Sequence, residues 1–134
     1  MREWKFSARS LERLQGVHPD LVELMVVAIK ESPYDFGITS GLRTETEQRK
    51  LVAEGKSKTM NSRHLKGEAV DIAVYYRGQL TWEFHYYKEV ARHIKIIARE
   101  LKGSVTWGGD WATFKDGPHY QINSTTNAHE VNDE

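Results

Sequence analysis

Residues 62–73, SRHLKGEAVDIA, decide how this chain folds, because they join a polar loop to an apolar strand through a single glycine. Gly67 permits a tight backbone bend that other residues resist. After the bend, apolar side chains recur at every second position, so Asp71 faces away from the apolar side of the predicted strand. The imidazole of His64, before the bend, and the carboxylate of Asp71 can therefore meet at one point, as two ligands of a divalent cation do.

A third ligand is available in residues 116–122, DGPHYQI, where a Gly-Pro bend again precedes a short extended segment. His119 lies directly after this bend. Two histidines and one carboxylate leave a fourth zinc position for water, which is the arrangement of a catalytic rather than a structural site. Asp116, three residues before His119, is a second carboxylate that could reach that water without being a ligand itself.

With these residues the chain resembles the M15 metallopeptidases, most closely the phage L-alanyl-D-glutamate endopeptidases. The family's first motif, Ser-x-His-x-x-Gly-x-Ala-x-Asp, is complete at residues 62–71, and its closing motif, an acid three residues before a histidine, is at residues 116–119. The resemblance extends over about residues 6–122. Further segments that look like the peptidoglycan-cleaving branch are residues 32–36, 41–44 and 107–111.

The resemblance implies a zinc site and a set of residues around it. Asp116 would accept a proton from water and pass it to the leaving nitrogen. Arg43 would stabilise the carbonyl oxygen as negative charge develops, or would bind a substrate carboxylate. The residues that would bind Zn²⁺ are His64, Asp71 and His119.

Two further polar residues have open assignments. Ser62 would hold the loop of the first motif or hydrogen-bond a ligand. Asp110 would orient a histidine ligand as a hydrogen-bond acceptor, and it competes with Asp116 for the role of base because it follows a Gly-Gly turn. The cations that could pair with a substrate carboxylate are Arg43, Lys58, Arg63 and Lys66.

The function implied by the resemblance is zinc-dependent cleavage of the L-Ala–D-Glu bond in peptidoglycan stem peptides, by a phage or prophage endolysin acting in host lysis. Two alternatives stay open. One is a D-alanyl-D-alanine carboxypeptidase or dipeptidase of the same family, and the other is a non-catalytic, zinc-containing binding module. The sequence has no His-Glu-x-x-His helix, Gly-x-Ser-x-Gly elbow or phosphate-binding glycine loop, which argues against a zincin, a serine hydrolase or a nucleotide enzyme.

Composition is consistent with a single peptidase domain over residues 1–134. The 19 basic and 19 acidic residues cancel, so no overall field argues for binding to nucleic acid or to an acidic membrane. No stretch approaches the roughly 20 apolar residues of a membrane span, so no membrane insertion is expected. We also expect a monomer. No cysteine is present, which leaves any zinc site to histidine and carboxylate. The first residues lack the apolar run of a signal peptide, so we expect the host cytoplasm, with the periplasm reached through a holin lesion.

The predicted fold class is α+β, with a small, largely antiparallel sheet packed against three or more helices, as in hedgehog and D,D-peptidase domains. Helices are predicted after Ser7, from Pro19, and from Thr44 to Gly55, where Thr44 and Glu47 form a capping box. The longest helix should end at Gly103. Strands are predicted at residues 36–40, 69–75, 105–107 and 120–122, within an ordered core of about residues 6–122 and before a polar tail, residues 123–134.

Overall fold

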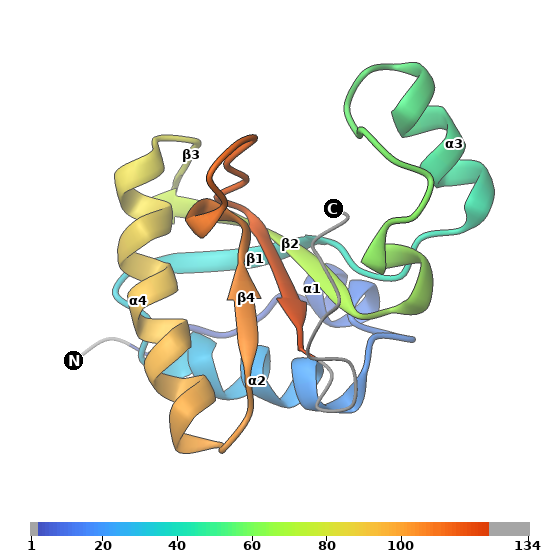
Figure 1. The fold of residues 1–134 in the computed structure, drawn as a ribbon. Coiled ribbons are helices and arrows are strands. Elements are labelled where there is room, and N and C mark those ends of the chain that lie inside the picture. The colour runs from blue at the N-terminus through green and yellow to red at the C-terminus, as the bar shows by residue number, and fades with distance from the viewer. Residues whose placement is uncertain (1–2, 124–134) are drawn as a thin grey trace.

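A computed structural model describes residues 3–123. Its strands form one sheet in the order β1-β2-β5-β4, with β3 added beside β2, and every pair is antiparallel, which confirms the predicted α+β class (Figure 1). The tail prediction falls almost wholly outside the described residues. The strands are β1 (Asp35–Ser40), β2 (Ala69–Tyr76), β3 (Gln79–Thr81), β4 (Val105–Trp107) and β5 (His119–Ile122). The helices are α1 (Ala8–Arg13), α2 (Pro19–Lys30), α3 (Glu45–Ala53) and α4 (Phe84–Glu100), with short 3₁₀ turns η1 (Arg63–Lys66) and η2 (Gly108–Asp110).

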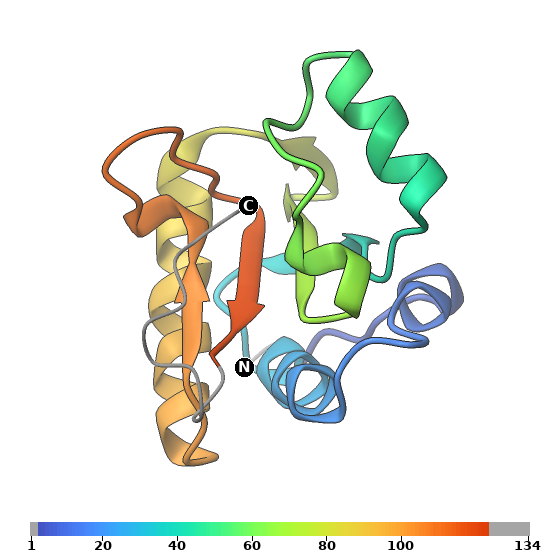
Figure 2. The same ribbon diagram turned by 45° about the vertical axis from the view of Figure 1, so that its right-hand side comes forward.

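The core lies between the sheet and the helices α2 and α4, which run across one of its faces (Figures 1 and 2). Strand β2 is central and is covered on both sides, because η1 packs against its other face. Ala69 and Ala73 are as fully buried as Val70 and Ile72, so the alternation in the sequence marks two covered faces rather than one covered and one open face. No helix within residues 3–123 combines the length and the apolar character that a bilayer span requires.

Local sequence signals fixed the helix starts. The Ser7 side chain caps α1, Pro19 opens α2, and Thr44 and Glu47 form the predicted capping box of α3. Helix α3 ends at Ala53, shortly before the predicted stop at Gly55. Strand β3 was not predicted. It is only three residues long, and it forms because a turn folds these residues back to pair with β2. Nothing in the sequence of the three residues indicates that pairing.

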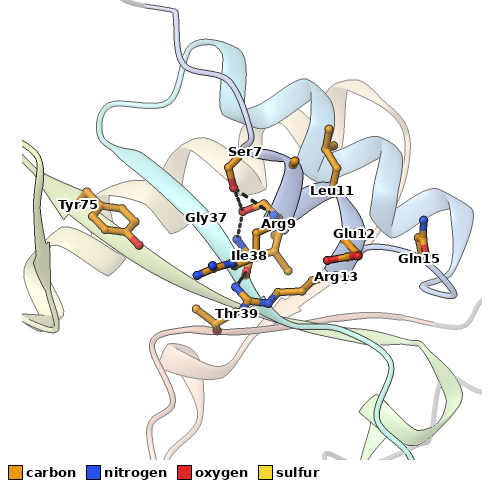
Figure 3. Close-up of a pocket in the computed structure, with 12 residues that line it drawn as sticks. Ser7, Arg9, Leu11, Glu12, Arg13, Gln15, Gly37, Ile38, Thr39 and Tyr75 are labelled. Carbon is orange, nitrogen blue, oxygen red and sulfur yellow. Dashed lines mark hydrogen bonds between the residues drawn. The ribbon is translucent and has the colours of Figure 1, made fainter.

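The outer edge of β1 is protected by α1 rather than by another strand. The Ser10 hydroxyl accepts a hydrogen bond from the Ile38 amide at 3.0 Å, and the Arg13 guanidinium donates to the Ile38 carbonyl at 3.1 Å. A groove of about 890 Å³ remains between α1 and β1, with these contacts inside it (Figure 3). The side chains thus satisfy backbone groups that would otherwise be free to pair with a foreign strand.

Two buried tyrosines allow a matched test of the fold. The Tyr87 hydroxyl accepts from the Val74 amide at 3.0 Å and donates to the Thr81 carbonyl at 2.7 Å, and burial raises its pKa to about 12. Tyr87→Phe leaves both backbone groups without this partner, so we expect it to lower the free energy of unfolding by about 1–3 kcal/mol. Urea denaturation of the two proteins measures the difference.

Tyr120→Phe is the control. The Tyr120 side chain is fully buried, and its hydroxyl has no hydrogen-bond partner among the described residues. Removing a buried hydroxyl that makes no hydrogen bond costs little and can stabilise, so we expect a change of less than about 0.5 kcal/mol or a gain in stability. Equal losses in the two variants would contradict this account of how α4 is tied to β2 and β3.

Candidate metal centre

Three side chains from separate parts of the chain meet at one end of the sheet. They are His64 from η1, Asp71 from β2 and His119 from β5, and their possible ligand atoms all lie within 4.8 Å of one another. Asp71 and His119 are direct partners in the β2–β5 register. His64 is brought to them by the bend at Gly67, which has a φ of +70° and whose Cβ, if added, would lie 2.4 Å from a backbone oxygen.

The orientation of the His64 ring fixes which nitrogen faces the cluster. Nδ1 lies 2.8 Å from the carbonyl oxygen of Gly41, and because a carbonyl only accepts, Nδ1 carries the proton. Nε2 is buried, lies 3.3 Å from Asp71 Oδ1, and has no hydrogen-bond partner among the described residues. The Ser62 hydroxyl accepts from the His64 amide at 3.1 Å and so caps η1.

The His119 ring faces the cluster with its other nitrogen, Nδ1. Its Nε2 lies 2.9 Å from Gln121 Oε1, which leaves Nδ1 to face Asp71 Oδ1 at 3.2 Å. Gln121 was missed from the sequence, although its position two residues along the same strand places it on the same face as His119. Asp110, predicted as an acceptor for a histidine ligand, instead lies at the surface with its carboxylate 2.5 Å from Lys95 Nζ. Gln121 and the Gly41 carbonyl fill the role predicted for Asp110.

The electrostatics of the cluster favour a bound positive charge. Burial alone would raise the pKa of Asp71, but the charge of His64 and the hydrogen bond and charge of His119 outweigh it and hold the pKa well below the ordinary 3.8. For His119, burial would lower the pKa, but the hydrogen bond and charge of Asp71 raise it above the ordinary 6.5. Two imidazole nitrogens and one carboxylate oxygen, each oriented inward, match the donors and number of protein ligands in a catalytic zinc site.

Arg43 holds the other oxygen of Asp71. Its Nη2 lies 2.9 Å from Asp71 Oδ2, which leaves Oδ1 directed at the two imidazoles. Its Nε donates to the Ser40 hydroxyl and its Nη1 to Gln48 Oε1. The Arg43 guanidinium therefore lies at the cluster, as predicted. It already forms an ion pair with the Asp71 carboxylate and does not point only into space that a substrate could fill.

Asp116 is positioned beside His119 by its backbone. Its amide donates to the Gly108 carbonyl at 3.0 Å, and its own carbonyl accepts from the His119 amide at 3.1 Å. A Cβ at Gly108 would lie 2.4 Å from that Asp116 carbonyl, so only glycine permits this close approach. The negative charge of Asp116 contributes to the raised pKa of His119.

Arg63, one of the cations named as a possible substrate partner, interacts with other parts of the protein instead. The Arg63 side chain is buried, donates to the Ile122 carbonyl at 3.2 Å and lies 3.5 Å from the Glu68 carboxylate. It links the turn that bears His64 to the last strand. Arg63 is therefore a structural residue, and sequence alone could not separate it from its neighbours because burial depends on the path of β5.

The chain is similar to known L-alanyl-D-glutamate peptidases. The L-alanyl-D-glutamate peptidase of Escherichia phage T5 is 31% identical over 112 residues, which is 81% of this chain and 82% of the relative. The peptidoglycan L-alanyl-D-glutamate endopeptidase CwlK of Bacillus subtilis is 32% identical over 107 residues, which is 66% of this chain and 60% of CwlK.

A solved structure is similar over most of its length. The crystal structure of Serratia marcescens L-Ala D-Glu endopeptidase ChiX superposes with a TM-score of 0.83 at 45% sequence identity, over 89% of this chain and 90% of that one. The family described as phage L-alanyl-D-glutamate peptidase matches residues 2–130. Since that match spans nearly the whole sequence, this chain belongs to the phage L-alanyl-D-glutamate peptidase family.

Proposed function

We propose that this protein is a zinc-dependent endopeptidase that hydrolyses the L-Ala–D-Glu bond of peptidoglycan stem peptides and serves a phage or prophage in host lysis. The observation that carries the proposal is the convergence of His64, Asp71 and His119 in a member of this peptidase family. Release from the host cytoplasm through a holin lesion would bring the enzyme to the wall.

In this proposal the protein prepares a site for zinc and for one proton transfer. The inward nitrogens of His64 and His119 and Oδ1 of Asp71 would hold the ion. When bound, zinc in such a site supplies a hydroxide nucleophile near neutral pH and polarises the scissile carbonyl. The Gly41 carbonyl and Gln121 keep each ring in the tautomer that directs a lone pair inward.

Asp116 and Arg43 complete the proposed chemistry. Asp116 would accept the proton of the attacking water and return it to the leaving nitrogen, a type of assistance worth about 10²–10⁴-fold in rate. Arg43 would act through Asp71, by fixing its carboxylate through Oδ2, and its remaining N–H groups would be available to the developing oxyanion.

The test is product analysis on purified muropeptides. The enzyme with zinc should split stem peptides between L-Ala and D-Glu, which mass spectrometry identifies, and a chelator should stop the reaction until zinc is added back. Loss of a terminal D-Ala instead would identify a D-alanyl-D-alanine carboxypeptidase. Bound zinc with no product from any peptide would identify a binding module.

Gln121 should affect zinc affinity without touching the ion. Gln121→Leu removes the acceptor of the His119 Nε2 proton, so the ring loses its fixed tautomer and orientation. Loss of such a partner typically lowers metal affinity or activity about 10–100-fold. Zinc titration against a competing chelator measures the change. Gln121→Glu retains an acceptor and should bind zinc at least as tightly as the wild type; equal weakening in both variants would contradict this role.

Zinc affinity should fall in mild acid. In the metal-free protein Asp71 raises the pKa of His119 above 6.5, so below that raised pKa a proton occupies the nitrogen that would bind zinc. The apparent affinity should drop by about tenfold for each pH unit below that pKa, because one proton competes with zinc at His119. The pKa of Asp71 is lowered, so Asp71 should not compete in this range. Chelator-competition titrations from about pH 5.5 to about pH 8.5 check the slope, and a flat profile would contradict the assignment of His119.

A further inference from the structure

The basic side chains of Arg43, Lys115 and Lys58 differ in the groups with which they already interact. Arg43 is paired with Asp71, and Lys115 donates to the carbonyls of Gly109 and Trp111. The Lys58 ammonium has no acidic partner among residues 3–123, and what sets it apart is its position 4.8 Å from the centroid of the Phe114 ring. A cation held only by an exposed ring is free to exchange that contact for an anion.

The backbone on both sides of Lys58 is tied to the metal centre. Gln48, which is fully buried, donates from Nε2 to the Ser57 hydroxyl and to the Thr59 carbonyl, each at 2.8 Å. The same amide accepts from Arg43 Nη1 at 3.0 Å, and Arg43 in turn holds Asp71. A continuous chain of hydrogen bonds therefore ties the residues on both sides of Lys58 to the cluster, while the Lys58 side chain itself is exposed.

The contact between Lys58 and Phe114 joins the two segments that lead into the histidines. Lys58 lies between α3 and η1, before His64, and Phe114 lies between η2 and β5, before His119. Phe114 is 70% exposed and has a φ of +52°, a left-handed conformation that bulky residues rarely adopt. Such strained positions are concentrated at ligand clamps and switch regions.

We propose that Lys58 is a specificity-determining residue that binds the free α-carboxylate of the D-Glu residue beside the cleaved bond, and that it leaves the Phe114 ring to do so. This inference rests on the proposed function, which puts that carboxylate next to the reacting carbonyl. A charged hydrogen bond between an ammonium and a carboxylate is stronger than a contact with an exposed ring, so the exchange is favourable. Lys58 acts on binding and takes no part in proton transfer.

The experiment compares two synthetic stem peptides, one with this carboxylate free and one with it converted to the amide. Lys58→Met should raise KM for the free-carboxylate peptide about 10- to 100-fold while kcat stays within about threefold, because a charged hydrogen bond formed in both ground and transition states is lost. The wild type should show a similar loss on the amidated peptide, and Lys58→Met should show no further loss there. Lys58→Arg should restore the preference for the free carboxylate.

Lys56→Met is the matched control, because Lys56 lies in the same segment but is paired with Glu54 at 3.5 Å. It should keep the wild-type kinetics on both peptides. Zinc content and melting temperature, measured for every variant, should not change. If Lys58→Met retains the wild-type preference for the free carboxylate, the role of Lys58 is overturned while the proposed function stands. If the wild type leaves the free-carboxylate peptide intact, the proposed function falls and this inference falls with it.

Discussion

Asp71→Asn should lose zinc and turnover together, with kcat/KM reduced to the background of the metal-free protein. Asp71 Oδ1 lies 3.3 Å from His64 Nε2 and 3.2 Å from His119 Nδ1, and its Oδ2 lies 2.9 Å from Arg43 Nη2. One carboxylate thus supplies a proposed ligand and also pairs with the Arg43 guanidinium. The amide removes the negative charge but keeps the shape, so the loss can be assigned to charge.

The loss of that charge also acts on the fold. Arg43 is only 16% exposed and would face a neutral amide beside a site meant for a dication. Breaking a buried ion pair by removal of one partner costs about 3–5 kcal/mol, and partial exposure to water reduces that figure here. Zinc content by inductively coupled plasma mass spectrometry, and unfolding of the metal-free proteins, separate the two effects. If Asp71→Asn retained stoichiometric zinc and more than about a tenth of the wild-type turnover, the ligand assignment would be wrong.

The convergence of His64, Asp71 and His119 was largely predictable because the motifs that contain them are short and tied to particular backbone conformations. Gly67 and Gly108 permit approaches that no other residue would tolerate, and the alternation around Asp71 fixed the direction of its side chain. The parts that sequence missed depend on tertiary packing. Gln121, Gln48 and the Gly41 carbonyl are polar groups whose roles exist only because distant segments bring a histidine or an arginine against them.

Tertiary packing also explains why the sequence could not decide between the two acids proposed as the catalytic base. Asp110 and Asp116 are both acids next to glycines in one loop, and the sequence could not rank them. The structure separates them through the backbone: Asp110 ends η2 with its side chain paired with Lys95, whereas Asp116 is held next to His119 by backbone hydrogen bonds to Gly108 and His119. The sequence could not rank Arg63 and Lys58 as substrate partners either. In the structure Arg63 is buried and donates to the Ile122 carbonyl of β5, whereas Lys58 is exposed.

Asp116→Asn should therefore separate proton transfer from metal binding. We expect kcat to fall about 10²–10⁴-fold because the amide cannot accept the proton of the attacking water. Zinc should remain bound, since Asp116 is not among the three side chains that converge as possible ligands. KM should change little, as for a group that acts mainly in the transition state. The backbone contacts with Gly108 and His119 do not involve the carboxylate, so the loop should keep its conformation.

Asp110→Asn is the matched control, with the same chemical change in the same loop. Its carboxylate is about half exposed and paired with Lys95, so the variant should keep turnover within about threefold of the wild type. The reverse result, an inactive Asp110→Asn with zinc bound and a near-normal Asp116→Asn, would transfer the role of base to Asp110. That result would also require the Asp110 carboxylate to leave Lys95, with which it is paired in this structure.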